Sequence, residues 1–438
     1  MSLDPYAEAA RRCREALLAG GEAKGQDVAT LAGGGDSPAA ARAVFQGVVE
    51  PLADLFEPRL VGSYVAFFAG LLDRVRGLAG FAELGARLTA AGLGTVDDIV
   101  GRFESIRRQQ TFDGDAARVR KVFVLSRITI GADVAVTSPI LQAALKVFPH
   151  AEISFVGGAK SARLFSGETA LRHLSLEYPR SGGLAERLSA WLRLADAIEA
   201  ESSGFAPERT LIVDPDSRLT QLGLLPLGLA DSAYLFFDSR SAGGEGEAPL
   251  ASLASEWARQ TLKTENAPKP FISLLDEDRA EGERLRRQSG GPLAAVNLGV
   301  GGNVAKRAAD PFETDLVKML LDRGWTVALD RGFGEEEYGR TEEIRRAADN
   351  ARLLAHDGSI ASFAGVIAAS DLYVGYDSAA SHITAALGVR GVDVFAGAAS
   401  PRMLSRWSPW GERPAALVAV EPGEESAPVL ARVREALE

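Results

Sequence analysis

The feature that most constrains the fold is a change of pattern at Val122. Before this residue, apolar side chains recur at three- and four-residue spacing, which is typical of amphipathic helices. From Val122 on, short runs of β-branched and aromatic residues alternate with amphipathic segments. This alternation favours βαβ units and a parallel sheet, so we predict an α/β protein preceded by an all-α region.

The strand-helix alternation occurs twice. The first array has predicted strands at 122–130, 152–158, 174–178, 210–214 and 233–238, and predicted helices at 137–148, 183–201 and 250–263. The second has predicted strands at 293–300, 325–330, 371–377 and 392–397, and predicted helices at 311–323, 334–348, 360–369 and 378–387.

The segment NAPKP at 266–270 separates the arrays and predicts a linker. We therefore expect three domains: a helical domain over 1–118, a Rossmann-like domain over 119–268 and a second Rossmann-like domain over 269–438. The two α/β domains are expected to face a cleft. Ligands in such sheets bind beyond the carboxyl ends of the strands, so the loops after strands are the places to look for chemistry.

Composition narrows the functional classes. The 438 residues include 48 basic and 59 acidic side chains, a net charge of −11 that argues against broad nucleic-acid binding. Cys13 is the single cysteine, so neither an intrachain disulfide nor a cysteine zinc site is expected, and a reducing, cytoplasmic location is the simplest interpretation. Uncharged apolar stretches such as 60–72 and 358–370 reach about 13 residues, short of the roughly 18 to 20 that a membrane helix needs, and no signal-peptide pattern is present.

The first candidate for chemistry is Asp133, in the loop predicted after the opening strand of the first array. A carboxylate between a strand end and a helix start projects toward the cleft, where it can accept a proton from a hydroxyl group. The alternative is that Asp133 or Thr137 only caps the following helix, and on this loop alone capping is favoured.

The second candidate is the segment GYDSAASH at 375–382. A strand ends here, small residues follow, and a helix begins with free N–H groups and the positive end of its dipole toward the cleft, which suits a phosphate. Asp377 and Ser378 lie at the helix start, and His382 lies on its first turns. A structural role for His382 and a functional one are evenly balanced.

The third candidate is the glycine-rich loop GVGGNVAKR at 299–307, directly after the first strand of the second array. Gly301 and Asn303 give backbone room, and Lys306 supplies a cation for phosphate oxygens. The loop does not match the dinucleotide-binding fingerprint, and the chain contains no P-loop sequence. The alternative for Lys306 is an ordinary solvated lysine.

Two longer segments resemble glycosyltransferase family 9, the lipopolysaccharide heptosyltransferase family. They are GADVAVTSPILQAALKVFPHAEISFVGG from Gly131 and FAGVIAASDLYVGYDSAASHITAALGVRGVDVFAGAASPRMLSRWSPWG from Phe363, of which the second is the more specific. The resemblance covers about 120–438 and leaves the helical region unaccounted for. It implies a GT-B fold and inverting transfer from a nucleotide-diphosphate sugar, usually ADP-heptose, with no cofactor and no obligatory metal.

Carried over by position, the resemblance makes Asp133 the general base and Lys306 a phosphate contact. Asp377, Ser378 and His382 would line the donor site, and Glu336, in the run Gly334–Glu337, would hold the nucleotide ribose, although acidic runs are usually solvated surface. The acceptor would be a glycan, glycolipid or protein. The helical region would contact acceptor, a protein partner or the inner face of a membrane.

Several residues depart from the family pattern. Ala132 is inserted before Asp133, Ala379 replaces the glycine usual after Asp-Ser, Arg390 stands in place of proline, and no tryptophan follows Lys306. These departures predict a divergent member with a different donor or acceptor. Two alternatives stay open: a nucleotide-sugar epimerase of GT-B architecture, and a non-catalytic sugar-nucleotide-binding assembly protein.

Overall fold

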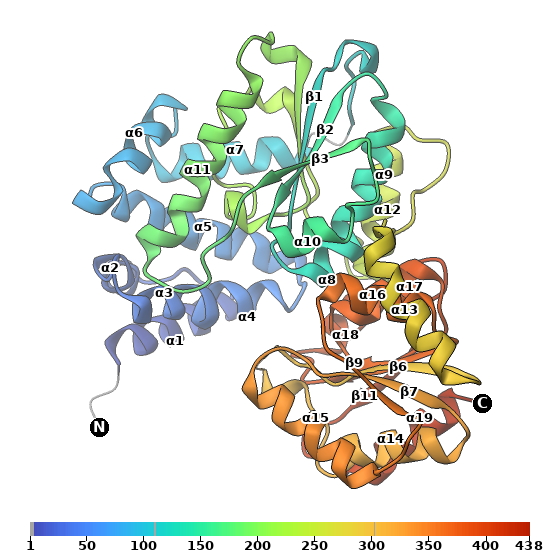
Figure 1. The fold of residues 1–438 in the computed structure, drawn as a ribbon. Coiled ribbons are helices and arrows are strands. Elements are labelled where there is room, and N and C mark those ends of the chain that lie inside the picture. The colour runs from blue at the N-terminus through green and yellow to red at the C-terminus, as the bar shows by residue number, and fades with distance from the viewer. Residues whose placement is uncertain (1–3, 109–110, 302) are drawn as a thin grey trace.

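The structure is a computed structural model that describes residues 4–108, 111–301 and 303–438. Its first part is helical and lies beside the first sheet (Figure 1). The helices of this part are α1 (Pro5–Leu18), α2 (Gly25–Gly33), α3 (Pro38–Val44), α4 (Glu50–Ala53), α5 (Pro58–Val75), α6 (Ala82–Ala90) and α7 (Val96–Arg108). Its described residues contain no strand, as the sequence pattern predicts.

The first sheet has five parallel strands in the order β3-β2-β1-β4-β5. The strands are β1 (Lys121–Leu125), β2 (Glu152–Gly157), β3 (Leu171–Ser175), β4 (Thr210–Asp214) and β5 (Tyr234–Phe236). The helices of this domain are α8 (Ile130–Ala132), α9 (Ser138–Val147), α10 (Ala159–Arg163), α11 (Leu184–Ser202) and α12 (Leu250–Thr261).

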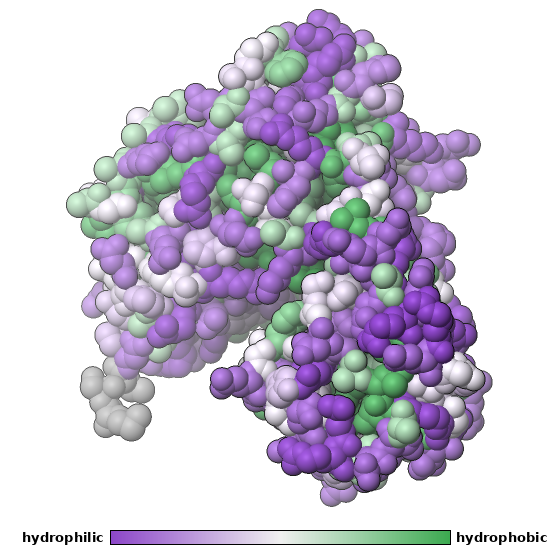
Figure 2. All heavy atoms as spheres, in the orientation of Figure 1, coloured by the Kyte–Doolittle hydropathy of each residue, from purple (hydrophilic) through white to green (hydrophobic). Residues whose placement is uncertain are grey.

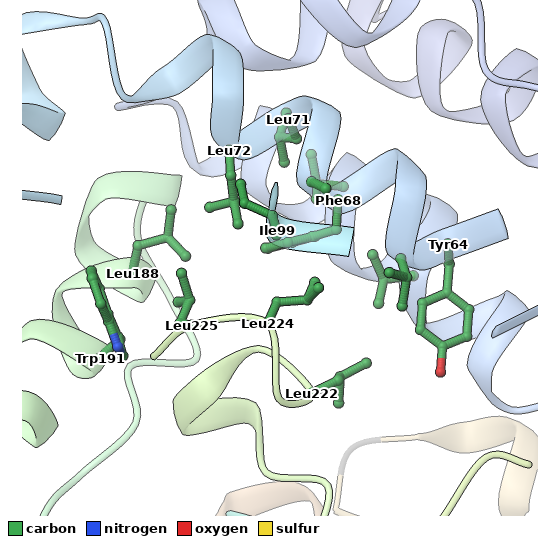
Figure 3. Close-up of a cluster of buried hydrophobic side chains, with 14 of the residues drawn as sticks. Tyr64, Phe68, Leu71, Leu72, Ile99, Leu188, Trp191, Leu222, Leu224 and Leu225 are labelled. Atoms are coloured by element: carbon green, nitrogen blue, oxygen red, sulfur yellow. The ribbon is translucent and has the colours of Figure 1, made fainter. Parts of the chain in front are cut away.

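The helical region and the first sheet share one hydrophobic core. Successive side chains of β1 point to opposite faces: Phe123 and Leu125 belong to the core that contains α1–α7, whereas Val122 and Val124 pack with α9 and α12. Figure 3 shows Phe68 and Leu72 of α5 and Leu188 of α11 among the side chains of this cluster. The first 118 residues therefore cover one face of the sheet.

The second sheet has six parallel strands in the order β11-β10-β9-β6-β7-β8. The strands are β6 (Leu293–Asn297), β7 (Thr326–Asp330), β8 (Leu353–His356), β9 (Leu372–Tyr376), β10 (Gly391–Ala396) and β11 (Ala416–Val420). The helices are α13 (Asp276–Ser289), α14 (Phe312–Asp322), α15 (Glu335–Ala348), α16 (Ile360–Ala368), α17 (Ala379–Leu387), α18 (Pro401–Trp407) and α19 (Ser426–Ala436).

The two α/β domains meet along α8, α17 and α18 (Figure 1). Trp407 of α18 packs edge-on against Phe56, with ring centroids 6.2 Å apart. The buried guanidinium of Arg406 donates to the Ala248 carbonyl at 2.6 Å, and Arg402 donates to the Phe56 carbonyl at 3.2 Å. These contacts of α18 thus hold the second α/β domain against the first part of the chain.

Several predicted elements need correction. The strand predicted at 122–130 ends at Leu125, because Ser126 and the backbone of Arg127 turn to bond Asp133 and Ile128 adopts a left-handed φ of 64°. The strand predicted at 174–178 is β3, three residues earlier, an edge strand whose side chains are mostly exposed and so lack a clear apolar signal. Within the two α/β domains the predictions omitted β8, β11, α8, α10, α13, α18 and α19.

Among the residues that the structure describes, one helical stretch is long and apolar enough to span a membrane. It is Ile130–Val147, and 67% of it is buried inside the protein. That burial is what the core helix of an α/β domain requires.

Helices α13 and α16 pack so closely that glycine is needed at the crossing. A Cβ atom at Gly365 would lie 2.0 Å from the Asp278 carbonyl oxygen. We expect Gly365→Ala to lower the free energy of unfolding by about 1–3 kcal/mol, because the helices must separate. The control is Gly62→Ala in α5, where no atom lies within 4 Å of the added methyl and alanine favours the helix. Equal effects in urea denaturation would contradict the close-packing argument.

Candidate active site

The start of α17 is the centre of the candidate site. β9 ends at Tyr376, and Ser378 then caps the helix by accepting a hydrogen bond from the Ala380 N–H at 3.3 Å. The positive end of the helix dipole therefore lies directly after a buried central strand. Gly375 has no room for a side chain, because a Cβ atom there would lie 2.5 Å from the Asn297 carbonyl oxygen.

Lys306 reaches the same point from the glycine-rich loop. Asn303 orders the loop by accepting a hydrogen bond from the Ala305 N–H at 3.2 Å. The Lys306 ammonium then pairs with the Asp377 carboxylate at 2.5 Å. Two residues that the sequence predicted separately, in loops 71 positions apart, are brought together.

Two further titratable groups, His382 and Asp393, are buried at this helix. Burial lowers the pKa of His382 to about 4, and its Nδ1 has no hydrogen-bond partner among the residues that the structure describes. Burial, with the Asp377 charge as a smaller cause, raises the pKa of Asp393 well above its usual range. Ser381 donates a hydrogen bond to Asp393 at 2.6 Å. Asp393 was not among the predicted site residues; its signal in the sequence is an acid within a predicted buried strand.

Asp133 lies in a helical segment, whereas the sequence predicted a loop there. α8 runs directly into a π-helical turn over Asp133–Thr137 and then into α9. This continuity arises because Asp133 accepts bonds from the Ser126 hydroxyl at 2.7 Å, from the Arg127 N–H at 2.7 Å and from the Thr137 hydroxyl at 3.0 Å. Neither Asp133 nor Thr137 caps a backbone N–H of α9.

The environment of Asp133 is fully buried. Its side chain has 0% exposure, and burial raises the pKa of the carboxyl group, an effect that its hydrogen bonds partly offset. A carboxylate of raised basicity suits proton abstraction, but its oxygens are already engaged in this structure. Its catalytic role stays a prediction.

The segment that holds Asp133 faces α17 across the domain junction. A Cβ atom at Gly131 would lie 3.1 Å from the His382 ring and 3.3 Å from the Ala379 Cα. The His382 ring also packs edge-on against Trp407, with centroids 6.0 Å apart. The predicted base of one domain and the predicted phosphate site of the other thus lie on two helices that touch.

Glu337, not the selected Glu336, organises the glycine-rich loop. Its carboxylate accepts hydrogen bonds from the N–H groups of Val300 at 2.8 Å, Gly301 at 3.0 Å and Phe333 at 2.8 Å. Glu336 is 57% exposed and pairs with Arg340 at 3.0 Å. Gly302, also in the predicted loop, lies outside the described residues. The sequence offered three adjacent glutamates, and only packing distinguishes the buried one.

We expect Glu337→Gln to lower the free energy of unfolding by about 1.5–3 kcal/mol, because it removes the charge that holds three backbone N–H groups. The matched control is Glu336→Gln, which removes an exposed charge and should change stability by less than about 0.5 kcal/mol. Guanidinium denaturation of both variants checks this difference. A larger loss in the control would contradict the assignment of Glu337 as the residue that orders the loop.

No group of three or more His, Cys, Asp or Glu side chains within the described part of the chain is arranged to hold a metal ion.

Comparisons with known proteins agree with this geometry. Residues 304–427 match the sequence profile of Glycosyltransferase family 9 (heptosyltransferase). No curated protein sequence matches the chain. Among solved structures, a glycosyl transferase family 9 protein from Veillonella parvula DSM 2008 is similar, with a TM-score of 0.56 and 14% identity over 72% of this chain and 95% of that one.

A second solved structure, the E. coli ADP-heptose LPS heptosyltransferase II, aligns with a TM-score of 0.48 and 19% identity over 72% of this chain and 97% of that one. The Veillonella likeness confirms the predicted fold class, two Rossmann-like domains of GT-B type, and the helical region precedes them in this chain. The profile match includes Lys306, Asp377, Ser378 and His382.

Proposed function

We propose that the chain is a member of glycosyltransferase family 9, whose sequence profile residues 304–427 match, and that it transfers a sugar, with inversion, from a nucleotide-diphosphate donor to an acceptor hydroxyl group. The observation that carries the proposal is the placement of Lys306 at the start of α17, directly across from the segment that holds Asp133. A cation and a helix N-terminus together form a site for a diphosphate.

The donor diphosphate would take the place of Asp377 as the partner of Lys306. Its negative charge increases as the sugar departs, and Lys306 and the α17 dipole stabilise that charge without a metal ion. Preorganised electrostatics of this kind contribute several kcal/mol to lowering a barrier. His382 is neutral, so its unpartnered Nδ1 can make a hydrogen bond to the donor without adding charge.

Inversion needs a single displacement, and one base is enough. Asp133 would take the proton of the acceptor hydroxyl group. As it does so, the hydroxyl oxygen attacks the anomeric carbon, and the bond from that carbon to the diphosphate oxygen breaks. Burial favours this proton transfer, because it raises the pKa of Asp133. The Ser126 and Thr137 hydroxyl groups keep the carboxylate oriented.

ADP-heptose is the first donor to test, because the matched family is described as heptosyltransferase. The acceptor is a hydroxyl of a glycan, glycolipid or protein. We place the reaction in the cytoplasm, at or near the inner membrane face, because the single buried Cys13 suits a reducing compartment. No nucleic-acid partner is proposed for a chain of net charge −11.

A second candidate is a non-catalytic sugar-nucleotide binder. The observation that favours it is that the Asp133 carboxylate is buried, with 0% exposure, and already accepts three hydrogen bonds. An epimerase would require further acid or base groups beside the donor.

The test is a melting-temperature screen with ADP-, GDP-, UDP- and dTDP-sugars, followed by product analysis. A ligand that binds only the folded state raises its stability in proportion to ln(1 + [L]/Kd). Stabilisation with sugar transfer to an acceptor supports the proposal. Stabilisation without turnover supports the binder, and an isomerised sugar nucleotide formed without acceptor supports an epimerase. No stabilisation by any donor would overturn the donor site itself.

A further inference from the structure

A cavity lies at the opposite end of the first sheet from the candidate active site. It has a volume of about 920 Å³ and lies among α6, α7, α11 and the segment 226–231. Thr210, the first residue of β4, lines it, so the cavity is at the end where the strands begin. Its size is that of a small-molecule site.

The walls of this cavity are mainly apolar. They include the side chains of Ala90, Leu93, Trp191, Ile198, Phe205 and Leu227. The Trp191 indole already donates its N–H to the Pro226 carbonyl at 2.7 Å, so it offers the cavity only an apolar surface. Phe205 is 37% exposed, and Figure 2 shows hydrophobic residues at the surface over α6 and α11.

Three of the four charged residues that line the cavity are already paired, and the fourth, Glu199, is exposed to solvent. Arg102 forms an ion pair with Asp231 at 3.1 Å and donates to the Gly223 carbonyl at 2.8 Å. Arg87 forms an ion pair with Asp196. A charged ligand would have to compete with these pairs, whereas an uncharged one would not.

Two hydroxyl groups at the cavity have no partner. The Oγ1 of Thr210, a residue with 2% exposure, and the Oγ of Ser202 are buried and make no hydrogen bond within the described residues. Both residues line the cavity. Buried polar groups in folded proteins are nearly always paired, so two unpaired hydroxyls around one apolar cavity indicate a missing partner.

We propose that this cavity binds an uncharged aliphatic molecule that carries a hydroxyl or carbonyl oxygen. The chain would fill the apolar walls, and its oxygen would pair with Thr210 and Ser202. Free alcohols or esters and the acyl chain of a membrane lipid share this chemistry. The site is separate from the sugar-transfer chemistry proposed above and does not depend on it.

The test uses the full-length protein and 1-octanol, with binding measured by calorimetry. We expect one saturable site in the wild type. Thr210→Val keeps the side-chain shape and removes the hydroxyl, so it should weaken octanol binding about three- to tenfold, the range for one lost hydrogen bond. Binding of 1-chlorooctane should be the same in both proteins.

Ser203→Ala is the matched control, because the Ser203 hydroxyl lines the same cavity but already donates to the Ala200 carbonyl at 2.7 Å. It should leave octanol binding unchanged. Ala195→Trp should block the cavity and abolish binding, and Thr210→Val still tests the proposal if that larger change prevents folding. Absence of saturable binding, or equal weakening by Thr210→Val and Ser203→Ala, overturns the proposal.

A vesicle-flotation experiment distinguishes the two sources of the ligand. If the ligand is a lipid chain, the wild type floats with phosphatidylcholine vesicles and octanol or Ala195→Trp releases it. If it is a free molecule, the protein binds octanol and does not float. Flotation that neither octanol nor the Trp variant reduces would show that lipid is held elsewhere and would overturn the lipid-chain assignment.

Discussion

Asp133→Asn is expected to lower kcat for sugar transfer by about 10²–10⁴, the usual contribution of a general base. Asparagine keeps the size of the side chain and can still accept bonds from the Arg127 N–H and the Thr137 hydroxyl, while Ser126 can rotate its own hydroxyl. The fold and the donor affinity should therefore be retained. The measurement is single-turnover transfer at saturating donor, with donor Kd and melting temperature determined in parallel.

Two results would argue against this role. Transfer at the wild-type rate would show that another group takes the proton. A loss of activity that parallels a large fall in melting temperature would show that Asp133 acts by holding the turn after β1. Thr137→Val is the control, because it removes one hydrogen bond to Asp133 and keeps the carboxylate.

Lys306→Ala is expected to weaken donor binding about 10- to 100-fold. Hydrogen bonds to charged groups are worth about 1.5–3 kcal/mol each, and the variant also leaves the Asp377 carboxylate unpaired where the diphosphate must bind. Calorimetric titration with the donor found in the screen measures this loss. A nucleoside without phosphates, if it binds, should be affected much less.

Lys318→Ala is the matched control, because Lys318 is an exposed lysine of α14 in the same domain. It changes the net charge by the same amount and should leave donor affinity within twofold. Equal losses of donor affinity in the two variants would show that Lys306 acts only through the net charge of the domain and not through a direct contact.

The sequence predicted the architecture well, because period-two and period-3.6 patterns are clear in buried parallel strands and their covering helices. It could not place β8 or β11, which lie at the edges of their sheet and are short or partly exposed. It also predicted a loop at Asp133. That residue is helical because three hydrogen bonds from nearby residues to its carboxylate order the turn, and such bonds leave no periodic pattern in the sequence.

The candidate site likewise has residues that could be predicted from the sequence and residues that could not. Asp377, Ser378 and Lys306 follow strands, so their meeting could be predicted from topology. The choice between Glu336 and Glu337 could not, because it depends on which face of α15 turns toward the glycine-rich loop. Asp393 was missed because nothing in the sequence distinguishes an acid of a site from any other residue of a buried strand. Its contact with Ser381 is visible only in the structure.

The core shared by residues 1–118 and the first sheet sets the rules for building chimaeras. Phe123 and Leu125 of β1 are covered by the N-terminal helices, so a cassette exchanged at residue 119 would carry an uncovered apolar face into its new host. An exchange at 266–270 keeps that face covered, because it divides the molecule between its two sheets. Such an exchange must preserve the contacts that Arg402, Arg406 and Trp407 make with the rest of the chain. Recombination of donor specificity in such enzymes therefore has one natural junction, and it is not the one closest to the extra helices.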